Sequence, residues 1–71
     1  MRDVAVVIPT LRRPEGLERA IRSVLTQEGV AERLREIVVA DNDPEASARP
    51  VVERLSGGPL PIIWTHAPRP G

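Results

Sequence analysis

The sequence contains no cysteine, no phenylalanine and no tyrosine, and Trp64 is its single aromatic residue. Without cysteine the chain can form neither a disulfide nor a thiolate metal site. Cysteine usage therefore does not indicate whether the protein belongs to an oxidising or a reducing compartment. Without other aromatic side chains, the hydrophobic core has to be built from valine, isoleucine, leucine and alanine. A chain of 71 residues is one small domain at most.

The sequence also lacks an excess of charge and a long apolar run. Ten basic and ten acidic residues give a formal net charge of +0, which argues against a nucleic-acid partner because nucleic acids are bound by basic surfaces. The longest apolar run, residues 4–8, is far shorter than the ~20 residues of a membrane-spanning helix. It is also too short, and too close to Arg2, for a signal-peptide core. We therefore expect a cytoplasmic chain without a membrane span.

Three segments have the character of β-strands. Residues 4–8 ("VAVVI") and 36–40 ("EIVVA") are nearly continuous runs of apolar and β-branched residues, which is typical of parallel strands covered on both faces. Residues 61–66 ("PIIWTH") begin with proline, which suits a strand at the edge of a sheet.

Two segments between them have the periodicity of amphipathic helices. Pro14 suits a first helical turn, and the helix it opens is predicted to end near Gly29. Its apolar face comprises Leu17, Ala20, Ile21, Val24 and Leu25. The second helix is predicted to have Ser47 as its N-cap, Pro50 in its first turn and Gly57-Gly58 at its end.

The order β-α-β-α-β predicts an α/β fold with a three-stranded parallel sheet in the order 3-2-1, because crossover connections are right-handed. In such sheets, ligands bind beyond the carboxyl ends of the strands. Residues 10–13, 41–43 and 66–69 all fall at that edge. With this order the first strand has an unpaired edge, which predicts self-association.

Several residues at this edge have two interpretations. Asp41 could accept a hydrogen bond from a nucleobase or a ribose, or form an Asx turn with Asn42 and Asp43. Thr10 could contact a ligand or cap the following turn. Arg12 and Arg13 could pair with a diphosphate or remain solvated. A structural role is expected for His66, which has no partner at metal-ligand spacing, and for Trp64, which is expected to pack on the sheet. No G-x-G-x-x-G or P-loop motif is present, which argues against dinucleotide and nucleotide-hydrolase sites.

The segment "VAVVIPTLRRPEGLERAIRSVLTQ" resembles the start of inverting family-two glycosyltransferases, which have the GT-A fold. "EIVVADND" is similar to the second-strand motif of that family, and "IIWTHAPRPG" to its third strand and the following loop. The resemblance implies that Asp41 recognises the nucleobase, typically through uracil N3–H, and that the Pro9-Thr10 corner holds the nucleoside. The nucleotide-binding residues it predicts are Pro9, Thr10, Leu11, Arg13, Asp41 and Asn42.

The sequence departs from the family pattern at one of these residues, Leu11, and at two neighbouring positions, Arg12 and Ala40. Leu11 stands where the family has a tyrosine that would stack on the base, and Arg12 stands in place of an asparagine. Ala40 replaces the first aspartate of a common pair. The identity of the base therefore stays open, with a UDP-sugar favoured.

In that family an Asp-x-Asp metal motif and a catalytic carboxylate lie further along the chain. Residues 41–43 ("DND") match the Asp-x-Asp pattern, but they follow the second predicted strand, whereas the metal motif of the family lies beyond the third. The resemblance therefore implies that residues 1–71 are the nucleoside-binding N-terminal part of a GT-A domain, truncated before the metal motif. On this interpretation the chain has no catalytic or metal-binding residue and is inactive alone. Mg²⁺ or Mn²⁺ and hexosyl transfer to an acceptor hydroxyl are expected only in the complete domain.

Two alternatives remain. The chain could be a non-catalytic module that binds a nucleotide or a protein through the same edge. It could also be a flavodoxin- or receiver-like signalling domain with Asp41 as phosphoacceptor or metal ligand. The signalling domain is disfavoured because it needs an acidic pair at the end of the first strand, where Thr10, Leu11 and Arg12 stand.

Overall fold

The computed structural model describes residues 3–27, 30–58 and 60–67. The elements follow one another as β1 (Val4–Thr10), α1 (Pro14–Thr26), α2 (Val30–Arg33), β2 (Leu34–Asp41), α3 (Arg49–Leu55) and β3 (Ile62–His66). The predicted alternation of strands and helices is confirmed. The short helix α2, a single turn of four residues that leads directly into β2, was not predicted from the sequence.

The strands form one parallel sheet in the order β1-β2-β3, with β2 in the centre. Along the register, Thr10 of β1 pairs with Asp41 of β2, and Asp41 pairs with His66 of β3. The last residues of the strands therefore lie side by side at one edge of the sheet. The parallel α/β architecture is as predicted, and each strand extends to the polar residue that follows its apolar run.

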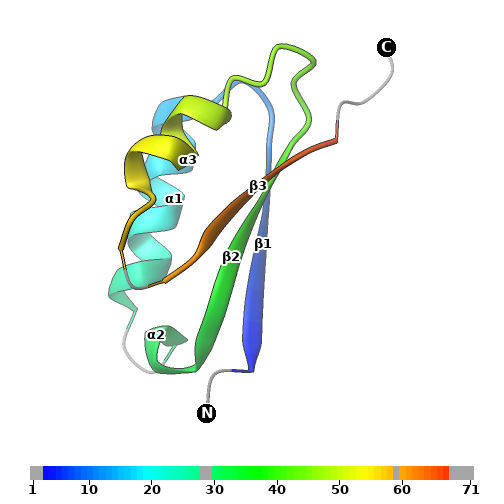
Figure 1. Cartoon of the computed structure of the whole chain (residues 1–71). Helices are drawn as coiled ribbons and strands as arrows, with labels where there is room; N and C mark the ends of the chain where they lie inside the picture. The colour runs from blue at the N-terminus through cyan, green and yellow to red at the C-terminus, as the bar shows by residue number, and fades with distance from the viewer. Residues whose placement is uncertain (1–2, 28–29, 59, 68–71) are drawn as a thin grey trace.

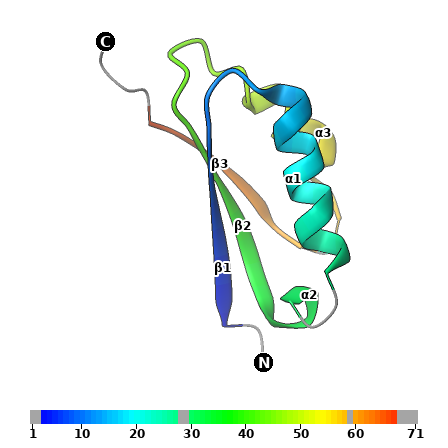
Figure 2. The same cartoon turned by 180° about the vertical axis from the view of Figure 1, so that it is seen from behind.

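Both longer helices cover the same face of the sheet (Figures 1 and 2). Exposure consequently alternates along β1, and the side chain of Val7 on the open face is 62% exposed. The prediction of strands covered on both faces is therefore wrong for the part of the chain that the structure describes. The reason is topological: two right-handed crossovers that step across the sheet in the same direction place both helices on one side.

The hydrophobic core lies between the helices and the covered face of the sheet. Its centre is β2, where Leu34, Ile37 and Val39 have no exposed surface. The buried core residues contributed by the helical side are Leu17, Ile21, Ala48, Val51 and Val52. Trp64 packs against this core with partial burial, as predicted.

The helix ends agree in part with the sequence. Pro14 and Pro50 occupy the first turns of α1 and α3, as predicted. The predicted stop at Gly29 lies outside the described residues. Helix α3, the second helix predicted from the sequence, ends at Leu55. It is followed by Gly57 with φ +102°, a backbone conformation that favours glycine. Among the described residues, no helix is long and apolar enough to cross a membrane.

The predicted cap of the second helix is wrong. The N-cap position of α3 is Ala48 rather than Ser47, and α3 has no side-chain cap of its own. Instead, the backbone N–H of Ala48 donates a hydrogen bond of 3.0 Å to Oδ2 of Asp41. The carboxylate at the end of β2 thus performs the capping function from a distance in sequence.

Candidate functional site

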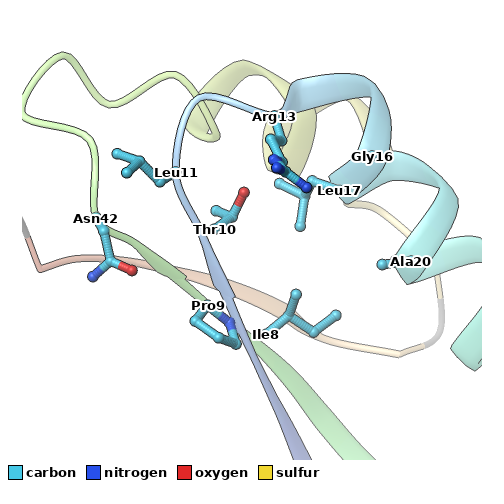
Figure 3. A pocket seen from close by; sticks show the side chains of 9 residues that line it. All are labelled: Ile8, Pro9, Thr10, Leu11, Arg13, Gly16, Leu17, Ala20 and Asn42. Atoms are coloured by element: carbon cyan, nitrogen blue, oxygen red, sulfur yellow. The ribbon is translucent and has the colours of Figure 1, made fainter.

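An open cavity of about 650 Å³ lies at the carboxyl end of β1, between that strand, the first turns of α1 and the loop after β2. Figure 3 shows the side chains around it. The lining residues are Ile8, Pro9, Thr10, Leu11, Arg13, Gly16, Leu17, Ala20 and Asn42. The cavity is at the sheet edge where the topology predicts ligand binding.

The end of β1 divides the lining into two sides (Figure 3). Because successive side chains of a strand point to opposite faces, Ile8 and Thr10 point toward α1. Pro9 and Leu11 point to the other side, where Asn42 lies. One side therefore combines the Thr10 hydroxyl with a cationic neighbour, and the other combines apolar surface with an amide.

The cationic neighbour is Arg13, the residue before α1. Its carbonyl accepts the N–H of Leu17 at 2.8 Å, which fixes the start of the helix, and its side chain is exposed. Gly16 widens the cavity here, since a Cβ at this position would lie 3.7 Å from the Cβ of Arg13. A smaller hollow of about 470 Å³ adjoins the cavity and is lined by Arg12, Arg13, Pro14, Glu15, Gly16 and Arg19. The surroundings of Arg13 are therefore electropositive.

Asp41 does not line the cavity. It is completely buried, and its carboxylate accepts three hydrogen bonds of 3.0 Å each: from the N–H of Asp43 to Oδ1, and from the N–H of Ala48 and Nε1–H of Trp64 to Oδ2. The contact with Asp43 is an Asx turn, so the structural interpretation of Asp41 is confirmed. A direct contact between Asp41 and a nucleobase stays a prediction.

Asp43 is a second buried carboxylate in the same loop, with 1% of its surface exposed. Its Oδ1 accepts hydrogen bonds from the N–H of Glu45 at 3.0 Å and from Nε of Arg12 at 3.2 Å. These donors stabilise the ionised form, the Glu45 N–H most strongly, and together with the Ser47 hydroxyl they lower the pKa of Asp43 against the opposing effect of burial. Arg12 reaches this bond from a left-handed backbone conformation, φ 52°.

Asn42 lies between these two carboxylates in sequence but faces the cavity. Its backbone N–H donates to the carbonyl of Thr10 at 2.8 Å. Its side-chain Nδ2 donates to the carbonyl of Ala67, also at 2.8 Å. The residue is therefore attached to β1 through its backbone and to the segment after β3 through its amide.

The end of β3 supports the loop from the other side. Nε2 of His66 lies 2.7 Å from the carbonyl oxygen of Asp43 and therefore carries the proton that it donates. The rings of His66 and Trp64 are stacked with centroids 5.3 Å apart. The guanidinium of Arg49 lies over Trp64, 5.4 Å from its ring centroid. The structural role predicted for His66 is confirmed.

The structure thus brings five of the six predicted nucleotide-binding residues to one cavity: Pro9, Thr10, Leu11, Arg13 and Asn42. The alternative role of Thr10 as a helix cap is wrong, because Arg13 is the N-cap of α1 and no side chain caps it. Sequence reasoning missed the floor of the cavity, formed by Ile8, Gly16, Leu17 and Ala20. The signal for it was the helical spacing of 16, 17 and 20, which places those residues beside the end of β1.

The part of the chain that the structure describes contains no group of three or more histidine, cysteine, aspartate or glutamate residues that could hold a metal ion. Asp41 and Asp43 are close in sequence, but the N–H groups of the loop occupy their carboxylates. A hard divalent cation needs several converging oxygen ligands. The loop geometry therefore does not fit a metal site.

Comparison with known proteins places this site in a family. The model for "Glycosyl transferase family 2" matches residues 5–71. The chain is also 43% identical, over 67 residues, to the succinoglycan biosynthesis protein ExoM of Rhizobium meliloti (strain 1021). That alignment covers 92% of this chain and 21% of the relative, so the chain spans about one fifth of the length of the relative. No solved structure matches. The parallel sheet, the cavity beyond its carboxyl edge and the matched residues agree, and the chain belongs to glycosyl transferase family 2.

Proposed function

We propose that the cavity at the end of β1 holds the nucleoside part of a nucleotide-sugar donor, with a UDP-sugar favoured. The observation that carries the proposal is the gathering of Pro9, Thr10, Leu11, Arg13 and Asn42 around one cavity in a chain of this family. Its volume of about 650 Å³ lies within the range of small-molecule sites. In the complete domain, this binding serves the transfer of a hexosyl group to an acceptor hydroxyl.

The two sides of the cavity suit different parts of a nucleotide. Leu11 is 52% exposed and, with Pro9, offers an apolar surface on which the face of a base can lie. Across the strand, the Thr10 hydroxyl can bond to the ribose, and the Arg13 guanidinium can pair with a phosphate. This arrangement orients the base toward the Asn42 side and the phosphates toward the start of α1.

The chain's contribution in this proposal is binding and orientation. None of the described carboxylates lines the cavity, and the two nearest to it in the loop after β2, Asp41 and Asp43, accept hydrogen bonds from that loop. We assign the general base and the Mg²⁺ or Mn²⁺ ion to the remainder of the complete domain. By likeness to the succinoglycan biosynthesis protein, we assign the complete domain to the biosynthesis of a saccharide. A cytoplasmic location stays a prediction.

The test is a titration of the chain with UDP. Binding is monitored through NMR chemical-shift changes and, separately, by calorimetry. Shift changes should concentrate at residues 9–13 and at Asn42. A more selective probe is Gly16→Ala, because its added methyl group meets Arg13 at an ordinary van der Waals distance of 3.7 Å. The variant narrows the cavity without strain, and alanine in place of glycine stabilises a helix by about 0.5–1 kcal/mol.

We expect Gly16→Ala to raise the free energy of unfolding of the chain and to weaken its binding of UDP. Gly58→Ala is the matched control, because no atom lies within 4 Å of a Cβ at that position. It should leave UDP affinity unchanged. A parent chain that binds no UDP, or equal affinities for the parent and Gly16→Ala, would refute the cavity as the nucleotide site. UDP binding without sugar transfer in the complete domain would favour the non-catalytic module.

A further inference from the structure

We infer that Arg12 is a positioning residue: by bonding to the buried Asp43, it holds the turn that places Leu11 beside a bound nucleoside. This inference rests on the proposed nucleotide-binding function, and it adds a residue that does not itself line the cavity. Leu11 and Arg12 both depart from the family pattern, so the resemblance implies no such role for Arg12.

The backbone of Arg12 makes the turn between β1 and α1. Its φ of 52° is left-handed, whereas an extended strand keeps residues i and i+2 on one face. The two neighbours of Arg12 accordingly lie on different sides of the end of β1, Leu11 toward Asn42 and Arg13 toward α1 (Figure 3). The left-handed conformation costs an L-residue free energy, because its Cβ approaches the following carbonyl oxygen. Arg12 therefore needs an interaction that holds it in this state.

That interaction is the ion pair with Asp43. Nε of Arg12 donates to Oδ1 of Asp43 at 3.2 Å, and the side chains of the two residues are 67% and 2% exposed. The carboxylate is fixed in advance, because the same oxygen accepts the N–H of Glu45 at 3.0 Å and the Asp43 carbonyl bonds to Nε2 of His66. Only the arginine has to be ordered, so the pair costs less conformational entropy than one between two mobile side chains.

The position of Leu11 depends on its neighbours. Leu11 is 52% exposed, so burial does little to fix it. On one side, the carbonyl of Thr10 accepts the N–H of Asn42 at 2.8 Å, and on the other side Arg12 bonds to Asp43. Both bonds join the segment around Leu11 to consecutive residues of the loop after β2. Leu11 is thereby placed before a ligand arrives, and binding does not have to order the turn.

A direct contact between Arg12 and a phosphate is the competing role. The pair with Asp43 uses Nε, and a guanidinium carries further N–H donors. Arg12 also lines the smaller hollow together with Arg13 and Arg19. Two ligands separate these roles, because uridine has the base and ribose of UDP but no phosphate. A positioning role for Leu11 affects the binding of both ligands, whereas a direct phosphate contact affects UDP alone.

The experiment measures the affinities for UDP and uridine, by NMR shift titration, in the parent chain and in Arg12→Gly. Glycine adopts the left-handed conformation without strain but removes the pair with Asp43. We expect both affinities to fall by about three- to tenfold, the range for one side chain that a ligand has to order. The urea midpoint should change little, because relief of the strained backbone offsets the lost pair and the added chain entropy. A purely structural role would lower the midpoint and leave the affinity of the folded chain unchanged.

Three further variants test the route through Asp43. Arg12→Lys keeps a cation that can pair with the carboxylate, so it should restore most of the affinity. Arg19→Gln removes the same charge from the same hollow without changing the turn, and it should leave the uridine affinity unchanged. Asp43→Asn should reduce both affinities by a smaller factor in the Arg12→Gly chain than in the parent, because the pair is already broken there.

The outcomes separate the inference from the function beneath it. A parent that does not bind uridine refutes the proposed nucleoside site, and the inference falls with it. Equal affinities of the parent and Arg12→Gly retain the site but overturn the positioning role. A loss confined to UDP overturns it as well, and so does an equal effect of Asp43→Asn in the two chains. If Arg12→Gly does not fold, Arg12→Asn takes its place, since asparagine also tolerates the left-handed conformation and lacks the guanidinium.

Discussion

The indole Nε1–H of Trp64 donates a hydrogen bond of 3.0 Å to Oδ2 of Asp41. The only aromatic residue of the chain is thereby attached, from β3, to the carboxylate that ends the central strand. The same oxygen accepts the N–H of Ala48 at the start of α3. One buried side chain thus connects β2, β3 and α3 directly beside the cavity, so the shape of the site depends on it.

We expect Asp41→Asn to destabilise the fold by about 2–4 kcal/mol. The asparagine keeps one acceptor oxygen but turns an NH₂ group toward N–H donors, which then lack a partner. Urea unfolding followed by Trp64 fluorescence and circular dichroism measures the loss. Asp3→Asn is the matched control: Asp3 is an exposed residue whose pairing with Arg33 contributes less than about 1 kcal/mol. Equal losses in both variants would refute the structural role of Asp41.

A second prediction concerns acid. The pKa of Asp43 is lowered from its ordinary value of 3.8, chiefly by the hydrogen bond from the Glu45 N–H. Since the native state favours the ionised form, this stabilisation is present above pH 3.8 and is lost as the pH falls through the lower native pKa. Asp43→Asn should therefore flatten the dependence of the unfolding free energy on pH below about 4.

Glu18 has to be separated from Asp43 in this experiment. Its pKa is also lowered, chiefly by the hydrogen bond from Arg54, and it contributes with the same sign. The comparison is therefore made in a Glu18→Gln background, by urea unfolding at a series of pH values. An Asp43→Asn profile as steep as that of the background would contradict the prediction.

The fold was predictable from the sequence where the signal is local. The β-branched runs specify β1 and β2, and prolines mark the first turn of each long helix and the edge strand β3. These features need only neighbouring residues, so they appear in the structure as predicted. The missing cover on the open face was not predictable in this way, because Val7 has the same character as a core valine and only the path of the helices decides its exposure.

The state of Asp41 was not predictable for a different reason. A carboxylate after an apolar strand has the same local pattern whether it binds a ligand or the chain itself. Its donors belong to residues 2, 7 and 23 positions away. The most distant of them, Trp64, meets Asp41 only once β3 has paired with β2. Five residues around the cavity could be predicted because they cluster at strand and helix ends, whereas burial depends on the assembled sheet.

A third prediction uses the strained loop before α3. Ala46 has φ 58°, a left-handed conformation that costs an L-residue roughly 1–2 kcal/mol. Glycine relieves this strain but loses more entropy on folding, so Ala46→Gly should raise the unfolding free energy by about 0.5–1 kcal/mol. Ala48→Gly is the control, because Ala48 has φ −82° and is buried, so the same change should destabilise. Loss of stability in Ala46→Gly would contradict the left-handed assignment.

The last prediction is self-association through β1. Within residues 3–27, 30–58 and 60–67, β1 pairs with β2 alone, so its outer edge presents backbone N–H and C=O groups without strand partners. Val7, 62% exposed, lies beside this edge on the uncovered face. An unpaired edge with apolar neighbours favours pairing with another chain.

Sedimentation velocity of the chain should therefore show a mass that increases with concentration. Lysine at an edge strand opposes such pairing through its charge, so Val7→Lys should shift the chain toward monomer. Ile63→Lys is the matched comparison: Ile63 is 43% exposed but lies on β3, at the opposite edge of the sheet. If both variants reduce association equally, the open face and not the β1 edge mediates it. A parent chain that sediments as a monomer at all concentrations would refute self-association altogether.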